Sequence, residues 1–367
     1  MRVPAAAIRF NTKVKTHFSV STFRLVISAA LVPATLGMLS ACGSSNPSHL
    51  AYVAGGQGVS AYRINNRSGN AAAILGSPFV AGNSPSSVVV HPSNRFLFVA
   101  NQVDSTISLF KIDSTSGALS EVLPRTNAGF SPAAMTMDAS GNFLFVANQG
   151  SNDVTAFSVS STGVLSNPSS FPLGSVPAGL AITSSGNFLF VSVPNFSSIY
   201  AFSVSSGSLQ FVGSFFVVNG VAGIAVDPGG NFLYATNPSA NTVSGFAISG
   251  GTLSPVPGVT FAAGTVPVAA AVDLSGKYLY VANSGSLTVS QYTIDASTGD
   301  LTALTKTAPT AGSSPAFIVD DPGGKFVFVG NTGASSITEM LINSDGSLTV
   351  ANTISLGFVP RWLAATK

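Results

Sequence analysis

The side chains best suited to chemistry lie near the C-terminal end of the chain. An arginine can clamp a carboxylate through two parallel hydrogen bonds, and an indole can stack on a ring. The chain contains seven repeats, described below, and at five positions its residue differs from the small or apolar residue that most other repeats have there. We expect these five residues to bind a polar ligand: Arg361, Trp362, Asp320, Glu339 and Phe317. The alternative is that these positions supply packing and ion pairs where the chain closes on itself.

Few other residues offer acid–base or metal chemistry. The chain has three His, 13 acidic residues and one Cys. His91 stands at the repeat position where other copies have an aspartate that can cap a turn through its own backbone: Asp138, Asp227, Asp273 and Asp321. His49 and His17 fall in the N-terminal segment. No His pair or metal-ligand triad remains, so we predict no metal and no cofactor and assign no catalytic residue.

The first 41 residues predict an export signal. Five basic residues and no acid precede an apolar stretch at residues 25–39, which is shorter than the roughly 20 residues of a membrane span. The sequence Leu39-Ser40-Ala41-Cys42 then resembles the bacterial lipobox, whose cysteine carries the lipid. We expect a lipoprotein signal peptide at residues 1–41, and a lipidated Cys42 with a short tether at residues 42–49. An ordinary cleaved signal and an uncleaved anchor are the alternatives.

Composition excludes several classes of protein. Charged residues make up 8% of the chain, against about 25% in an ordinary domain, while 46% are hydrophobic. Disorder driven by high charge is therefore excluded, and a lone Cys excludes a disulfide framework. Five of the 15 basic residues precede Cys42, which leaves ten against 13 acids and a net charge of −3. We therefore expect no nucleic-acid partner, because phosphate binding needs a basic face.

One unit of about 45 residues occurs seven times from Leu50 onward. It is marked by an apolar run, such as Phe96-Leu97-Phe98-Val99, whose copies follow one another at intervals of 44 to 48 residues. An alternating run ending in an aromatic residue, a run opened by Gly-x-Leu and a run led by Pro complete each unit. The repeats lie near residues 50–95, 96–142, 143–187, 188–231, 232–277, 278–325 and 326–367.

Four strands per unit of this length are typical of a β-propeller blade. The chain ends with a Pro-led run, from Val359 to Ala364, that no apolar run follows. We predict an all-β fold at residues 50–367: a seven-bladed β-propeller of four-stranded antiparallel blades, closed by the C-terminal strand joining the N-terminal blade. A non-closing solenoid is the alternative. Seven blades bury a sufficient core, so we expect a monomer.

Three motifs recur in the units: the Phe/Tyr-Leu-Phe/Tyr-Val-Ala-Asn run, the Asp-Pro-Gly-Gly-Lys turn and the Gly-x-Leu start. With these motifs the chain resembles the seven-bladed lactonase-type propellers, which include 6-phosphogluconolactonase-like proteins, and the related YVTN repeat proteins. The resemblance implies lactone hydrolysis by His, Glu and Arg side chains near the central channel. Only Arg361 can be matched to that set, because Glu121 and Glu339 have no His at the same repeat position.

Two functions are compatible with these observations. The first is an exported, lipid-anchored binding or scaffold module of the cell envelope, periplasmic or at the outer membrane. Its partners would be the membrane, through the lipid on Cys42, and an envelope protein or a small lactone or carbohydrate. The alternative is a lactone (carboxylic ester) hydrolase that opens a sugar or carboxylated lactone.

Overall fold

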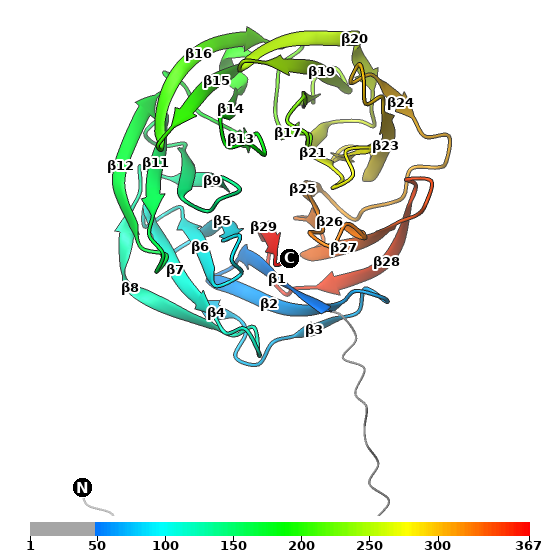
Figure 1. Cartoon of the computed structure of the whole chain (residues 1–367). Helices are drawn as coiled ribbons and strands as arrows, with labels where there is room; N and C mark the ends of the chain where they lie inside the picture. Colours follow the sequence, from blue (N-terminus) through cyan, green and yellow to red (C-terminus); the bar gives the residue numbers. More distant parts are fainter. Residues whose placement is uncertain (1–47) are drawn as a thin grey trace, which may run out of the picture. The chain divides into compact units, whose positions relative to one another are not determined.

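A ring of seven antiparallel sheets makes up the part of the chain that the computed structural model describes, residues 48–367 (Figure 1). This architecture confirms the predicted all-β, seven-bladed propeller. The signal peptide and the lipidated Cys42 predicted from the sequence lie outside the described residues. Within residues 48–367 we find no helix with the length and apolarity that a membrane crossing requires.

Six blades contain four strands each, numbered in chain order from the axis outward (Figure 1). They are β5 (Pro85–Val90), β6 (Phe96–Asn101), β7 (Thr106–Ile112) and β8 (Leu119–Asn127); β9 (Pro132–Met137), β10 (Phe143–Asn148), β11 (Asp153–Val159) and β12 (Leu165–Pro172); β13 (Gly179–Ile182), β14 (Phe188–Val193), β15 (Ser198–Ser205) and β16 (Ser208–Phe216); β17 (Ile224–Val226), β18 (Phe232–Asn237), β19 (Thr242–Ser249) and β20 (Thr252–Ala262); β21 (Pro267–Val272), β22 (Tyr278–Asn283), β23 (Thr288–Ile294) and β24 (Leu301–Ala303); and β25 (Pro315–Asp320), β26 (Phe326–Asn331), β27 (Ser336–Ile342) and β28 (Leu348–Ser355). One turn of 3-10 helix, η1 (Pro194–Phe196), follows β14.

The two ends of the described chain share the remaining blade. Its strand order is β29 (Pro360–Ala365), β1 (Ser48–Gly55), β2 (Gly58–Asn65) and β3 (Ala71–Ala73), with β4 (Phe79–Val80) also paired to β2. β29 runs antiparallel to β1, which confirms the predicted closure of the ring. β1 begins at Ser48, two residues before the predicted start of the propeller, so His49 belongs to a strand and not to a tether.

The sequence repeat reflects packing between neighbouring blades. The apolar runs form the second strands and are buried. The hydroxyl of Tyr52 donates a hydrogen bond of 3.0 Å to the carbonyl of Gly117, which opens the third run of the next blade. Gly163, at φ +84°, holds the equivalent position one blade later, where a Cβ would come within 2.9 Å of the Phe96 ring. The Gly-x-Leu start is therefore a requirement of blade stacking.

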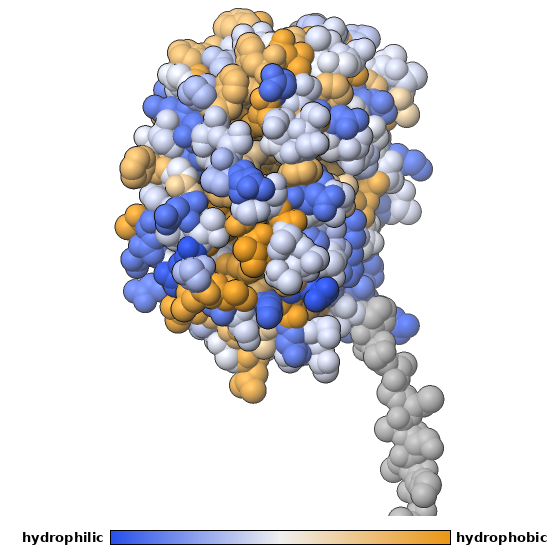
Figure 2. Space-filling view, turned by 60° about the vertical axis from the view of Figure 1, so that its left-hand side comes forward, coloured by the Kyte–Doolittle hydropathy of each residue, from blue (hydrophilic) through white to orange (hydrophobic). Residues whose placement is uncertain are grey.

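Uncharged polar residues build much of the outer surface. In β12 the central residues Ser166, Asn167, Pro168, Ser169 and Ser170 are all exposed. On the side of the ring shown in Figure 2, hydrophilic and hydrophobic residues are interspersed. This agrees with the low charge content of the sequence.

The ends of the inner strands define two faces of the ring. We call the face at which the inner strands begin the proline face, because five of these strands start with a proline: Pro85, Pro132, Pro267, Pro315 and Pro360. The turns that follow the inner strands form the aspartate face, named for Asp138, Asp227, Asp273 and Asp321, with His91 at the same position. His91 is confirmed as a turn residue, because its Nδ1 accepts a hydrogen bond of 3.1 Å from the backbone N–H of Ser93.

Candidate functional site

The middle of the channel offers no acid or base. A cavity of about 200 Å³ lies between the inner strands and is lined mainly by small residues, among them Ala134, Ala178, Gly179, Ala222 and Gly223. The hydroxyl of Ser87 also lines it, but it accepts a hydrogen bond of 3.1 Å from the backbone N–H of Met135. This part of the channel can admit a small neutral group and cannot transfer a proton.

A second cavity, of about 360 Å³, lies toward the aspartate-face ends of the inner strands. Val88, Thr136, Asp138, Asp320 and Trp362 are among the residues that line it. Trp362 lines the channel cavity as well, so its side chain lies between the two spaces. The volume is within the range of small-molecule sites, roughly 300–1,000 Å³. We call this space the Asp320 cavity.

The carboxyl group of Asp320 is the reactive group of this cavity. Both of its oxygens are buried, and neither accepts a hydrogen bond of ordinary geometry from the described residues, although the backbone N–H groups of Leu274 and Asp321 lie nearby. Burial raises the pKa of Asp320 to about 8, and the negative charges of Asp273 and Asp321 add to the rise. The backbone N–H groups of Leu274 and Asp321 offset part of it. A carboxylate with this pKa is a far stronger base than an ordinary aspartate.

Trp362 and Phe317 pack against each other, with ring centroids 5.4 Å apart. Phe317 is 1% exposed and belongs to the core, whereas Trp362 is half-buried and reaches the cavities. Of these two predicted ligand-binding residues, only Trp362 therefore presents surface to the Asp320 cavity.

Arg361 lies at the other end of its strand from this cavity. The pairing of β29 with β1 shifts register between Trp362 and Pro360, which leaves Arg361 as the extra residue of a β-bulge. Ala316 holds the same bulge position in β25 as Arg361 does in β29. Asp320 lies four residues after Ala316, so the level of Arg361 and the level of Asp320 are about 13 Å apart along the strand direction. Arg361 is exposed at the proline face, and the lining of neither cavity includes it.

Glu339 lies between blades and away from the channel. It belongs to β27, two strands outward from β25, and is 0% exposed. A Cβ at Gly69 of the first blade would come within 2.8 Å of its Oε1. Burial raises the pKa of Glu339 to about 8, with a further contribution from Asp321 and a partial offset from Lys325. The five predicted residues thus do not converge: Asp320 and Trp362 share a cavity, while Arg361, Phe317 and Glu339 do not line it.

His49 is a buried polar residue that the sequence analysis misplaced. Its Nε2 lies 3.3 Å from Asp321 Oδ1, and its Nδ1 lies 2.9 Å from Asn66 Oδ1. In other blades the aspartate of this turn bonds to the backbone, as Asp227 Oδ1 does to the N–H of Phe232 at 2.6 Å. Asp321 instead directs one oxygen toward His49. No sequence pattern indicated this contact, because the first repeat departs from the others and His49 precedes its apolar run.

Thr136 is a further residue that sequence reasoning missed. It lines the Asp320 cavity from β9, and its hydroxyl makes no hydrogen bond with another residue of the described part. It is therefore free to donate to a ligand oxygen. Alignment of the repeats could have found it, because the corresponding residues of the other blades are aliphatic: Val89, Ala181, Ala225, Ala271, Val319 and Ala364.

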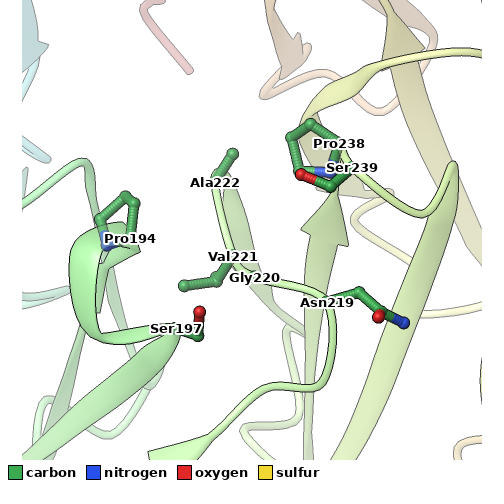
Figure 3. Close-up of a pocket in the computed structure, with 8 residues that line it drawn as sticks. All are labelled: Pro194, Ser197, Asn219, Gly220, Val221, Ala222, Pro238 and Ser239. Carbon is green, nitrogen blue, oxygen red and sulfur yellow. The ribbon is translucent and has the colours of Figure 1, made fainter.

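The proline face carries a third cavity, of about 560 Å³, between the blade of β13 and the blade of β17 (Figure 3). Its lining comes from the loops after β14, β16 and β18: Pro194, Ser197, Asn219, Gly220, Val221, Ala222, Pro238 and Ser239. In Figure 3, the Asn219 side chain points away from Ser197 and Ala222. None of these residues has an acidic or basic side chain, so the cavity offers hydroxyl and amide contacts only.

Residues 48–367 contain no group of three or more His, Cys, Asp or Glu side chains placed to hold a metal ion. The chemistry available to the Asp320 cavity is thus that of one carboxyl of raised pKa, a hydroxyl and an aromatic ring.

Comparison with known proteins defines the family. The family model described as "Lactonase, 7-bladed beta-propeller" matches residues 59–175 and 214–319, together more than half of the chain. No curated protein matches the chain by sequence.

Several solved structures are similar in fold. A Bacteroides fragilis protein provisionally assigned as a 6-phosphogluconolactonase aligns with a TM-score of 0.77 and 21% identity over 88% of this chain and 99% of its own. The periplasmic gluconolactonase of Pseudomonas aeruginosa aligns with a TM-score of 0.73 and 20% identity over 88% and 99%. Hydrazine synthase of Kuenenia stuttgartiensis also aligns, with a TM-score of 0.60 and 17% identity over 77% and 89%. Such likenesses concern the fold, which hosts unrelated activities. By its family-model match, this chain belongs to the seven-bladed β-propeller lactonase family.

Proposed function

We propose that this protein is a lactone hydrolase that opens a neutral sugar lactone in the Asp320 cavity. Family membership supports the reaction class. The observation that carries the proposal is the position of Asp320: this residue lines a cavity of ligand size, and its carboxyl accepts no hydrogen bond of ordinary geometry from residues 48–367 and has a pKa of about 8.

The lining favours an uncharged substrate. It contains Asp138 and Asp320 but no Lys, Arg or His, so a phosphorylated lactone would meet negative charge without compensation. Trp362 offers an aromatic face to a sugar ring, and aliphatic residues such as Val88 and Leu180 line the same cavity.

The reaction needs one base and one hydrogen-bond donor. The Asp320 carboxylate accepts a proton from water while the water oxygen attacks the lactone carbonyl carbon. Thr136 donates a hydrogen bond to the developing oxyanion. When the ring C–O bond breaks, the leaving alkoxide takes the proton from Asp320, which regenerates the carboxylate and yields the hydroxy acid.

The test uses the full-length protein and a panel of neutral, carboxylated and phosphorylated lactones. We expect hydrolysis of neutral sugar lactones above the buffer rate and a loss of about 100-fold or more in Asp320→Asn, as is typical for removal of a general base. Glu339→Gln is the matched control, because it changes a buried carboxyl of similar pKa outside the cavity. Hydrolysis that survives in Asp320→Asn would refute the role of this cavity.

The same experiment separates hydrolysis from the binding function expected from the sequence. A lactone or carbohydrate that binds the protein without being consumed would support a non-catalytic module of the envelope. We further propose that the protein is exported and anchored through a lipid on Cys42, in the periplasm or at the outer membrane. The support for this is the sequence of residues 1–42.

A further inference from the structure

Basic residues gather on one sector of the aspartate face. Arg63, Arg67, Arg95, Lys111 and Lys325 come from three consecutive blades, the last, the first and the second along the ring. Lys325 Nζ donates hydrogen bonds of 2.8 and 3.0 Å to the carbonyls of Asn66 and Arg67. Arg63 Nη2 donates one of 2.8 Å to the carbonyl of Thr115 in the next blade. These contacts place the five cations on one continuous surface, which we call the cationic sector.

Acidic residues do little to neutralise the cationic sector. Asp113 is exposed there and stays ionised, because hydrogen bonds from its own turn lower its pKa, but it forms no ion pair with any of the five cations. Asp321 and Asp138 lie beneath the surface, at 1% and 6% exposure. Among the described residues, the ion pairs do not involve Arg67, Arg95 or Lys111. Arg63 and Lys325 are absent from these pairs as well, so all five cations of the sector lack a carboxylate partner among the described residues.

A cavity of about 520 Å³ lies within the cationic sector. Arg95 and Lys111 line it together with Ser114 and Thr162. Arg95 immediately precedes β6, and Lys111 of β7 pairs with Phe96 of β6. The Arg95 guanidinium stands 5.3 Å from the Phe96 ring centroid, which helps to hold it at the rim. A guanidinium, an ammonium and two hydroxyls form a donor set suited to a phosphate group.

The chain enters the propeller at the same surface. Ser48, the first residue of β1, pairs with Asn65, two residues before Arg67. Five residues lie between Cys42 and Ser48, so the distance between these two residues is at most about 22 Å. A lipid on Cys42, as proposed above, would hold the cationic sector close to the bilayer.

We propose that the cationic sector rests on an anionic bilayer surface and that the cavity of Arg95 and Lys111 binds the phosphate group of a lipid headgroup. A basic residue near an anionic bilayer strengthens binding about five-fold. The proposal is independent of catalysis because it requires no reaction, although the Asp320 cavity also lies toward the aspartate face.

The test measures co-sedimentation of the full-length chain carrying Cys42→Ser with vesicles of phosphatidylcholine alone or mixed with phosphatidylglycerol. The substitution removes the lipid, and the N-terminal segment is the same in every variant, so its contribution cancels. We expect the double variant Arg95→Gln, Lys111→Gln to bind the mixed vesicles about 25-fold more weakly, two charges at about five-fold each. Binding to phosphatidylcholine alone should not change.

Arg361→Gln is the matched control, because it removes an exposed cation from the proline face. We expect it to bind mixed vesicles as the parent does. Equal losses in Arg361→Gln and the double variant would overturn the proposal, as would a double variant that binds like the parent. Inorganic phosphate that competes at micromolar concentration and abolishes vesicle binding would also overturn it, since the cavity would then be a site for free phosphate.

Discussion

Val53 of β1 lies opposite Leu363 of β29, and this pairing joins the first blade to the last strand of the chain. Both side chains are 1% exposed. Leu363→Ala should therefore lower the free energy of unfolding by about 2–5 kcal/mol, the usual cost of removing a buried leucine. Denaturant unfolding measures the change. Leu75→Ala, at a residue 95% exposed, should shift it by less than about 0.5 kcal/mol. Equal effects would mean that closure does not depend on this contact.

Glu339→Gln should stabilise the protein increasingly as the pH rises. Because burial raises the pKa of Glu339 to about 8, the folded protein binds this proton more tightly than the unfolded chain. Its contribution to stability is present below pH 4.5 and is lost as the pH rises through about 8, at about 1.4 kcal/mol per pKa unit. Gln carries no charge and avoids this loss.

The measurement is the melting temperature of Glu339→Gln and the parent at pH 5, 7 and 9. The difference should be small at pH 5 and should favour Gln at pH 9. Glu121→Gln removes a surface ion pair with Arg125 instead and should give no stabilisation at pH 9. A Glu339→Gln difference that is independent of pH would contradict the assignment.

Lactone hydrolysis by this protein should depend on the ionisation of Asp320. With a pKa raised to about 8 by burial and by Asp273 and Asp321, the carboxyl is mostly protonated at pH 7 and cannot accept a proton. We expect kcat/KM to rise with pH and to level off above about pH 8, after subtraction of the spontaneous rate. A profile without a transition near pH 8 would exclude Asp320 as the base.

Trp362 should affect substrate binding more than proton transfer. Trp362→Ala should raise KM by about five-fold, since aromatic stacking contributes roughly 1 kcal/mol, while Trp362→Phe should keep most of the affinity. Because Trp362 also packs on Phe317, melting temperatures of both variants are needed to confirm folding. A fall in kcat with unchanged KM in both variants would argue against stacking.

Cys42→Ser should abolish labelling of the protein by radioactive palmitate in cells that process lipoproteins. The expectation follows from the Leu39-Ser40-Ala41-Cys42 sequence, in which the only Cys stands at the lipidation position. Membrane fractionation in high salt, which screens the attraction of the cationic sector to the bilayer, provides a second readout, since the variant should then move to the soluble fraction. Labelling that persists would exclude Cys42 as the attachment point.

The propeller could be predicted because its determinants are local and repeated. Seven apolar runs at nearly constant spacing specify seven second strands, and the glycine of each Gly-x-Leu start marks a close approach between blades, as at Gly163 and Phe96. The Pro-led run at the C-terminus lacked a following strand, and β1 lacked a preceding one. Each local pattern therefore agreed with one architecture, including its closure.

The site could not be predicted in the same way, because it depends on where side chains from different blades point. Alignment of the repeats identified Arg361, Asp320 and Glu339 as unusual. A β-bulge puts Arg361 on the proline face, whereas Asp320 lies near the opposite end of its own strand, toward the aspartate face. Glu339 is buried between blades, two strands outward from the inner strand β25. His49 and Asp321 come within 3.3 Å only because the ring closes. Periodic sequence encodes the backbone of a propeller, whereas the meeting of side chains at its channel and its seam arises from ring geometry that no single repeat contains.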